Sequence, residues 1–372
     1  MTRLSADEAR ELGHTVRAAC ERLATEERVR EIAYGDSGGD SYDTELWRVL
    51  CRQVGVGAIA LPEEAGGAGY GARALGVVAH ELGRALAPVP FLASTVLATG
   101  LLVDTGVDEQ LLAGLIDGER TATAVLTERA GSWNRNAVAA VASHNSNGWS
   151  LRGTAHHVLY GGAADDLVVV ATIDTEPAIF LVDSAAHGVT IKPERVLDKT
   201  RPMATIEFTA AAATRLSGDG PVDDVIERSL DRAIAVLSAE QVGACERVLE
   251  IATDYARTRE QFGRAIGSFQ AIKHRCADML VDLEWARSAS LAALRSVDDD
   301  DGDSRWRVSM AKAVCSEALR AASHANLQIH GGIGFTWEDS AHLYVKRART
   351  DEVIFGAPGA HWDRLAAEAK LL

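Results

Sequence analysis

A long helical pattern fills the C-terminal part of this chain. Apolar residues recur at three- and four-residue spacing across residues 225–255, which is about eight helical turns. Two further stripes of the same kind cover residues 269–291 and 306–325. Long amphipathic helices must bury their apolar faces against one another, so the segment predicts an antiparallel bundle of three or four helices.

Two different patterns precede the bundle. Residues 119–217 contain short β-type runs that alternate with turn residues, namely ATAVLTE, NAVAAVA, DLVVVATI, AIFLVD, GVTIKP and ATIEFTA. The polar stretch SHNSNG (143–148) is typical of a hairpin connection. Residues 1–118 are helical in pattern, with a glycine-rich break at LPEEAGGAGYGA (61–72) and a helix over 73–86 that Pro88 and Pro90 end.

The order of these patterns narrows the fold. We expect an α+β multidomain protein with an N-terminal helical domain (1–118), a central β-barrel-like domain (119–217) and a C-terminal four-helix bundle (218–372). Between the second and third stripes, DDDDGD (298–303) is a run of like charge that predicts a solvated loop.

Charge and composition exclude several classes of protein. The chain has 53 acidic and 38 basic residues, a net charge of −15, which disfavours nucleic-acid binding because phosphates need clustered cations. No apolar run has the length of a membrane span, and the polar start lacks the apolar core of a secretory signal. The 5 cysteines lack metal-ligand spacing, so we expect buried reduced thiols, no metal site and a cytoplasmic location.

Two passages of the bundle resemble motifs of the acyl-CoA dehydrogenase family. They are YARTREQFGRAIGSFQAIKHRCADM (255–279) and QIHGGIGFTWEDSAHLYVKRART (328–350), in the family's order and at its mutual distance. LTERAGS (126–132) is similar to the family's flavin-facing strand, shortened by one residue, and PEEAGGAG also looks familial. The resemblance spans nearly the whole chain. It implies the acyl-CoA dehydrogenase fold, FAD as cofactor and an acyl-CoA thioester as substrate.

The resemblance also implies which residues contact FAD: Arg259, Phe262, Gln270, Gln328, Gly331, Gly332, Thr127 and Ser132. The Arg259 guanidinium offers a bidentate fork to the diphosphate, and the two adjacent glycines let the backbone approach it without a Cβ. The two glutamines would hydrogen-bond ribose or adenine. Phe262 would pack near the adenosine half, although a phenylalanine taken alone is more often a core residue.

The chain departs from the family where the catalytic base should be. Dehydrogenation needs a base for the α-proton, a flavin to take the β-hydride and hydrogen bonds to the thioester carbonyl. An ungapped count from Gly331 places the usual glutamate position at Phe355. A count back from Gly263 places the alternative position at Ala233. Neither side chain accepts a proton, so we identify no catalytic residue.

The flavin-facing segment departs as well. HVLYGGAAD (157–165) aligns with a family pattern in which His157 replaces a tryptophan that packs on the flavin. Leu159 replaces the hydroxyl residue near the flavin N5 atom. The departures from the family pattern therefore all lie on the isoalloxazine side of the expected FAD site, whereas the motifs for its adenosine and diphosphate side are intact.

This asymmetry favours a non-catalytic partner subunit. In an actinobacterial branch of the family that acts on steroid thioesters, two unlike chains form an α2β2 tetramer, and the resemblance implies that this chain supplies adenosine-side groups to FAD in the other chain's pocket. An electron-transfer flavoprotein would accept the electrons. One alternative is a self-sufficient homo-oligomeric acyl-CoA dehydrogenase that uses Glu240 or Glu352 as its base. A second alternative is a scaffold protein that keeps the fold without FAD.

Overall fold

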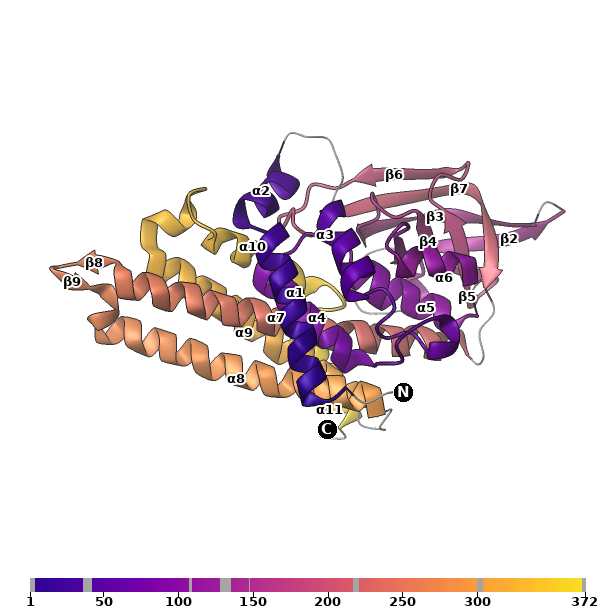
Figure 1. Cartoon of the computed structure of the whole chain (residues 1–372). Helices are drawn as coiled ribbons and strands as arrows, with labels where there is room; N and C mark the ends of the chain where they lie inside the picture. The colour runs from indigo at the N-terminus through magenta and orange to yellow at the C-terminus, as the bar shows by residue number, and fades with distance from the viewer. Residues whose placement is uncertain are drawn as a thin grey trace.

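The computed structural model describes residues 4–35, 42–106, 109–127, 135–146, 148–216, 221–299 and 304–369. Figure 1 shows N-terminal helices packed beside a sheet, and a long helical bundle that extends away from both. This is the predicted α+β architecture, with the sheet in the middle of the sequence and the bundle at its end.

The N-terminal helices are α1 (Ala6–Leu23), α2 (Glu26–Tyr34), α3 (Thr44–Val49), α4 (Ala72–Ala85), α5 (Thr99–Asp104) and α6 (Glu109–Ile116). A capping box begins α1, since the Ser5 hydroxyl accepts the Glu8 N–H and the Glu8 carboxylate accepts the Ser5 N–H. Helix α4 confirms the expected 73–86 helix to within one residue at each end. Two π-helical turns, η1 (Leu50–Val54) and η3 (Leu92–Ala98), extend α3 and precede α5.

The central strands form a 7-stranded sheet that closes on itself. They are β1 (Ala122–Val125), β2 (Ala140–Asn145), β3 (Gly148–Leu159), β4 (Asp166–Ile173), β5 (Glu176–Asp183), β6 (Val189–Pro193) and β7 (Met203–Leu216). Strands β4, β2, β3, β7 and β5 pair in that order, and β5 pairs again with β4. This ring confirms the expected barrel-like arrangement and the β2–β3 hairpin.

Two details of the sheet differ from the sequence expectation. The run NAVAAVA does not form a strand from its start, because Asn136 and Ala137 belong to a 3-10 turn and β2 begins at Ala140. The longest strand but one, β3, was not among the expected runs. Its sequence, GWSLRGTAHHVL, is too polar to stand out, since only part of one face is buried.

The C-terminal bundle contains α7 (Val222–Thr258), α8 (Gln270–Asp299), α9 (Ser304–His330) and α10 (Ala341–Val353), followed by α11 (Pro358–Glu368). A short hairpin of β8 (Glu260–Gln261) and β9 (Arg264–Ala265) joins α7 to α8. Helix α4 packs directly on α7, where a Cβ at Gly243 would lie 1.9 Å from the His80 carbonyl oxygen. Glycine is therefore required at this contact between the N-terminal helices and the bundle.

Asp298 corrects the expectation that residues 298–303 form only a solvated loop. It is the penultimate residue of α8 and is largely buried. Its carboxylate accepts the backbone N–H groups of Ala72 and Arg73 and pairs with the Arg73 guanidinium at 3.0 Å. Because Gly71 at the N-cap of α4 has no side chain, Asp298 caps that helix from a distant part of the chain.

Buried charges join the sheet to the bundle: Asp198, Arg201, Glu240, Lys312, Arg347 and Asp351. The Arg347 guanidinium donates to Asp198 at 2.7 Å and to Glu240 at 2.6 Å. Arg201 pairs with Glu240 and lies 3.3 Å from Asp351. The cluster contains three acidic and three basic side chains, and burial raises the pKa of the Asp351 carboxyl to about 7.

Other expectations concern the whole chain. The 5 cysteines are free thiols, and all except Cys276 are buried. Burial raises the pKa of the Cys20, Cys51 and Cys245 thiols to about 12, which makes them unreactive. Among the described residues, no helix combines the length and the apolar composition needed to cross a membrane. No group of three potential metal ligands occurs in the described ranges.

Candidate functional site

Arg259 and Phe262 lie at the far end of the bundle, where α7 gives way to the β8–β9 hairpin (Figure 1). Arg259 is the C-cap of α7, and its exposed guanidinium has no partner among the described residues. Phe262 and Gly263 form the two-residue loop, with φ of 54° and 73°, the left-handed pair that a tight hairpin requires. Phe262 is 93% exposed, so it is not the core residue that a phenylalanine taken alone suggests.

A ring stack fixes this hairpin beside the second motif. Tyr255, one turn before Arg259, stacks on His330 at the end of α9, with ring centroids 4.0 Å apart and planes 22° apart. His330 is buried, and its Nδ1 lies 2.9 Å from the Asn326 carbonyl oxygen. The stack brings the C-terminal ends of α7 and α9 together, although Tyr255 and His330 are 75 positions apart in the sequence.

The glycine pair follows His330 directly. Gly331 has φ of 64°, which favours glycine, and begins the 3-10 turn η6 (Gly331–Phe335). A Cβ added at Gly331 or Gly332 would meet nothing within 4 Å, so both positions face open space. From this space a ligand can contact the backbone of either glycine. Gln328, one turn earlier on α9, is exposed. Gln270 is exposed on α8, with its Nε2 2.8 Å from His274 Nε2.

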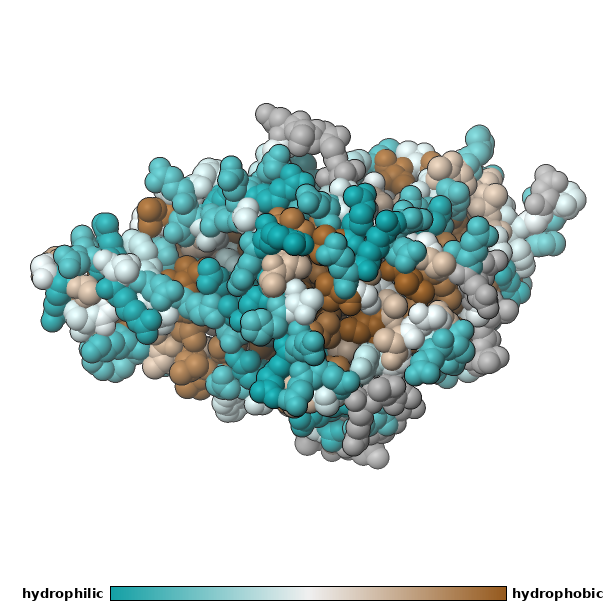
Figure 2. Space-filling model, viewed as in Figure 1, coloured by the Kyte–Doolittle hydropathy of each residue, from teal (hydrophilic) through white to brown (hydrophobic). Residues whose placement is uncertain are grey.

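Several large apolar side chains of the bundle are exposed. Phe262 lies in the hairpin, Leu280, Val281 and Trp285 lie in the first half and middle of α8, and Ile333, Phe335 and Trp337 lie in or just after η6. Figure 2 shows hydrophobic colour over α8 toward the hairpin end of the molecule. Contiguous exposed apolar side chains of this size are typical of surfaces that another protein or a ligand covers.

Thr127 lies elsewhere, in a cavity on the sheet side of the molecule. The cavity has a volume of about 50 Å³, and its lining includes Thr127, His157, Leu159, Leu230 and Phe355. The structure therefore brings together the residues that the sequence assigned to the flavin-facing strand and to the base position. Small-molecule sites typically enclose roughly 300–1,000 Å³, so an isoalloxazine ring does not fit in this space.

Neither of the two expected base positions carries a carboxylate, although the imidazoles of His156 and His157 line the cavity. Phe355 is buried, with φ of 58°, and its carbonyl oxygen lies 2.9 Å from His361 Nε2. Ala233 is fully buried within α7. His157 also has a left-handed φ of 58°, and both its backbone N–H and its ring bind the Glu194 carboxylate. The sequence analysis missed Glu194, because nothing in the sequence links it to His157 across 37 positions.

The two alternative bases are held in ion pairs. Glu240 accepts from Arg347 at 2.6 Å and from Arg201, and its side chain is 8% exposed. Glu352 pairs with Arg320 at 3.4 Å and with Arg349. Neither carboxylate lines the cavity at Phe355.

The site residues thus fall into two separate places. Six of them, Arg259, Phe262, Gln270, Gln328, Gly331 and Gly332, lie at or beside the end of α7, the start of α8 and the end of α9. None of these six lines the cavity that contains Thr127. Ser132 lies outside the described residues. The donor set at the bundle end fits the adenosine and diphosphate half of FAD, whereas the cavity at Phe355 does not fit its isoalloxazine half.

Comparisons with known proteins agree with this geometry. The acyl-CoA dehydrogenase N-terminal domain matches residues 6–119, and the acyl-CoA dehydrogenase C-terminal domain matches residues 224–370. Acyl-CoA dehydrogenase IpdE2 of Mycobacterium tuberculosis is 33% identical over 362 residues, which cover 97% of each chain. The chain therefore belongs to the acyl-CoA dehydrogenase family, flavin-dependent oxidoreductases that act on CH–CH bonds.

Two solved structures of this family are heteromeric by name. The ChsE4–ChsE5 complex of Mycobacterium tuberculosis superposes with a TM-score of 0.87 at 30% identity and covers 100% of both chains. A variant of the Tcur3481–Tcur3483 steroid acyl-CoA dehydrogenase superposes with a TM-score of 0.86 at 31% identity and covers 98% of both chains.

Proposed function

We propose that this chain is the non-catalytic subunit of a two-component, FAD-dependent acyl-CoA dehydrogenase that acts on a sterol-derived thioester. The contrast between the two site halves carries the proposal: the adenosine-side groups are exposed at the bundle end, while the cavity at Phe355 has a volume of about 50 Å³ and no carboxylate among its described lining residues. The similarity to the ChsE4–ChsE5 complex and to a steroid acyl-CoA dehydrogenase supports both the heteromer and the substrate class.

In this complex the chain's residues bind and orient, and the second acyl-CoA dehydrogenase-like chain supplies the base. The Arg259 guanidinium would hold the diphosphate by charge-assisted hydrogen bonds, and the backbone at Gly331 and Gly332 would approach it closely. Phe262, held out from the hairpin, would cover the adenosine half. FAD, when bound, accepts the β-hydride of the thioester. An electron-transfer flavoprotein would then receive the electrons.

The proposal is tested by replacing Arg259 in the assembled complex. Arg259→Ala removes a charge-assisted contact worth roughly 1.5–3 kcal/mol, so FAD retention should fall about tenfold or more. Arg259→Lys should retain FAD partly, because the charge remains without the fork. Arg257→Ala is the matched control, since Arg257 is exposed two positions earlier and pairs with Asp254. Flavin absorbance per complex is the measurement, and unchanged flavin in Arg259→Ala would refute the assignment.

A second variant addresses the missing base. Phe355→Glu places a carboxylate at the family's base position, but Leu159 and the His157–Glu194 pair still line that cavity. We therefore expect no dehydrogenation by the isolated variant chain supplied with FAD and an acyl-CoA. Turnover by this variant would mean that the cavity can accept a flavin and a thioester.

A further inference from the structure

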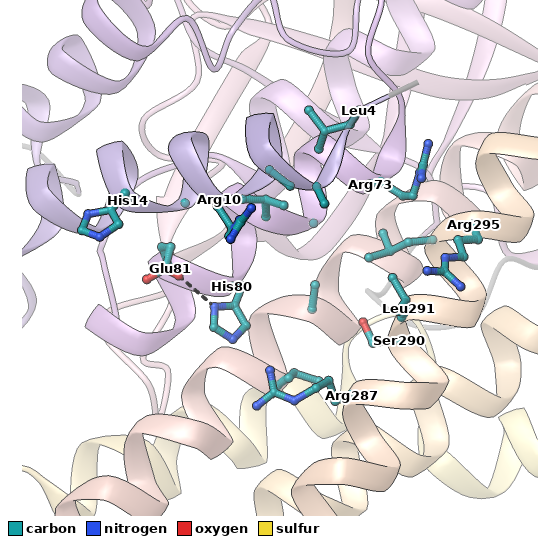
Figure 3. Close-up of a pocket in the computed structure, with 18 of the residues that line it drawn as sticks. Leu4, Arg10, His14, Arg73, His80, Glu81, Arg287, Ser290, Leu291 and Arg295 are labelled. Atoms are coloured by element: carbon teal, nitrogen blue, oxygen red, sulfur yellow. Dashed lines mark hydrogen bonds and ion pairs between the residues drawn. The ribbon is translucent and has the colours of Figure 1, made fainter. Parts of the chain in front are cut away.

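Another cavity shares no lining residue with either half of the FAD site. It opens between α1, α4, α7 and α8 and has a volume of about 710 Å³, within the range of small-molecule sites. None of its lining residues lines the cavity at Phe355. Figure 3 shows it between the helix of Arg10 and His14 above and the helix of Arg287 and Arg295 below.

One wall of this cavity is apolar. Val77 of α4, Val242 of α7, and Leu291 and Leu294 of α8 contribute aliphatic side chains to it. Leu291 is 42% exposed, and Figure 3 shows its side chain directed into the cavity. An aliphatic side chain exposed in a concave surface loses its water contacts when a hydrocarbon covers it, so this wall favours an apolar ligand body.

The rest of the lining is rich in cations. The chain carries a net charge of −15, yet these arginines line the cavity: Arg10, Arg17, Arg73, Arg287 and Arg295. The first four pair with carboxylates, for example Arg17 with Glu81 at 2.8 Å and Arg73 with Asp298 at 3.0 Å. Arg295 is exposed and has no partner among the described residues.

His14 of the lining is exposed, whereas the buried titratable groups of the wall are paired. His80 lies between two carboxylates, with Nδ1 3.1 Å from Glu81 and Nε2 2.9 Å from Glu246. Burial lowers the pKa of His80, but the hydrogen bonds to Glu246 and Glu81 outweigh burial and raise it overall. Glu81 is also held by Arg17, so it does not repel an anion as a free carboxylate would. Arg295 is thus the charge available to a ligand.

We propose that this cavity binds an amphipathic monocarboxylate, with its head on Arg295 and its hydrocarbon body on the wall formed by Val77, Val242 and Leu291. A planar carboxylate matches the fork of one guanidinium through two parallel hydrogen bonds. Figure 3 shows Arg73 and Arg295 at one end of the cavity and His14 at the other. The hydrocarbon body of the ligand therefore extends along the cavity from the end at Arg295 toward the end at His14. The proposal does not depend on FAD or on the role of Phe355.

Calorimetric titration of the full chain, in the oligomer it forms, tests this proposal with decanoate as the probe. Decyl alcohol tests the need for the charge, and acetate tests the need for the body. We expect saturable binding of one decanoate per chain, clearly weaker binding of decyl alcohol and none of acetate. Arg295→Gln should weaken decanoate binding about tenfold or more, because a hydrogen bond between charged groups is lost.

Two further variants complete the design. Ala9→Phe, from a half-buried position on α1 that lines the cavity, should abolish binding by filling it. Arg22→Gln, an exposed arginine of the same helix outside the cavity, should change nothing. Circular dichroism checks that the variants fold. If Ala9→Phe does not fold, Arg295→Gln still tests the proposal, because Arg295 is exposed. Absent decanoate binding, equal binding of decyl alcohol, or unchanged affinity in Arg295→Gln would overturn the proposal.

Discussion

At the scale of single residues, His80 makes stability depend on pH. Its pKa in the folded chain is raised above 6.5 by the hydrogen bonds to Glu246 and Glu81, so the folded state binds its proton more tightly than the unfolded state does. The contribution of His80 to the free energy of unfolding is therefore fully present below about pH 6.5. It is lost as the pH rises through the pKa of His80 in the folded chain.

We predict that the stability difference between the native chain and His80→Gln shrinks as pH rises from about 6 to about 9. Urea unfolding across this range measures it. His14→Gln is the control, because His14 is exposed and has no partner among the described residues. A difference that stays constant or grows with pH would contradict the ion-pair assignment of His80.

Individual contacts were the least predictable from sequence. The motif around Arg259 indicated the adenosine side, yet the stack of Tyr255 on His330 that joins the two motifs has no sequence signal, since it forms between distant helix ends. Phe262 illustrates the opposite case. Taken alone it suggests the core, and only the left-handed hairpin turn explains why it is exposed.

At the scale of elements, α4 depends on a cap from another helix. The Asp298 carboxylate accepts two of the first N–H groups of α4, which Gly71 cannot satisfy. We predict that Asp298→Ala lowers the free energy of unfolding by about 0.5–2 kcal/mol. Thermal or urea unfolding measures the loss. Asp278→Ala, an exposed aspartate of the same helix, should be nearly neutral, and equal effects of the two variants would refute the capping role.

The elements themselves were largely predictable where their periodicity is strong. The stripes over residues 225–255, 269–291 and 306–325 correspond to α7, α8 and α9, because each helix buries apolar residues of its stripe, although Leu280 and Leu291 of α8 are exposed. Strand β3 was missed because its polar residues alternate with few apolar ones, and pairing with β2 and β7 determines its conformation. Asp298 was misjudged because a charge run gives no sign of the helix end it caps.

At the scale of the whole molecule, the buried charge cluster connects the sheet to the bundle. Arg347 of α10 neutralises Asp198 from the sheet domain and Glu240 from α7. We predict that Arg347→Met destabilises the chain by about 3–5 kcal/mol, because two buried carboxylates lose their shared cation. Arg349→Met is the matched control: Arg349 lies on the same helix, is half exposed and pairs with Glu352, so its loss should cost less than about 1 kcal/mol. Urea unfolding that gave similar losses for both would contradict this role.

The central claim is that this chain completes a FAD site in a second chain. Native mass spectrometry tests it most directly, on the chain produced alone and then together with a second acyl-CoA dehydrogenase-like chain that carries the catalytic base. We predict a flavin-poor chain alone, and a particle of two chains of each kind with two FAD when both are present. A homo-oligomer that carries one FAD per chain would contradict the account.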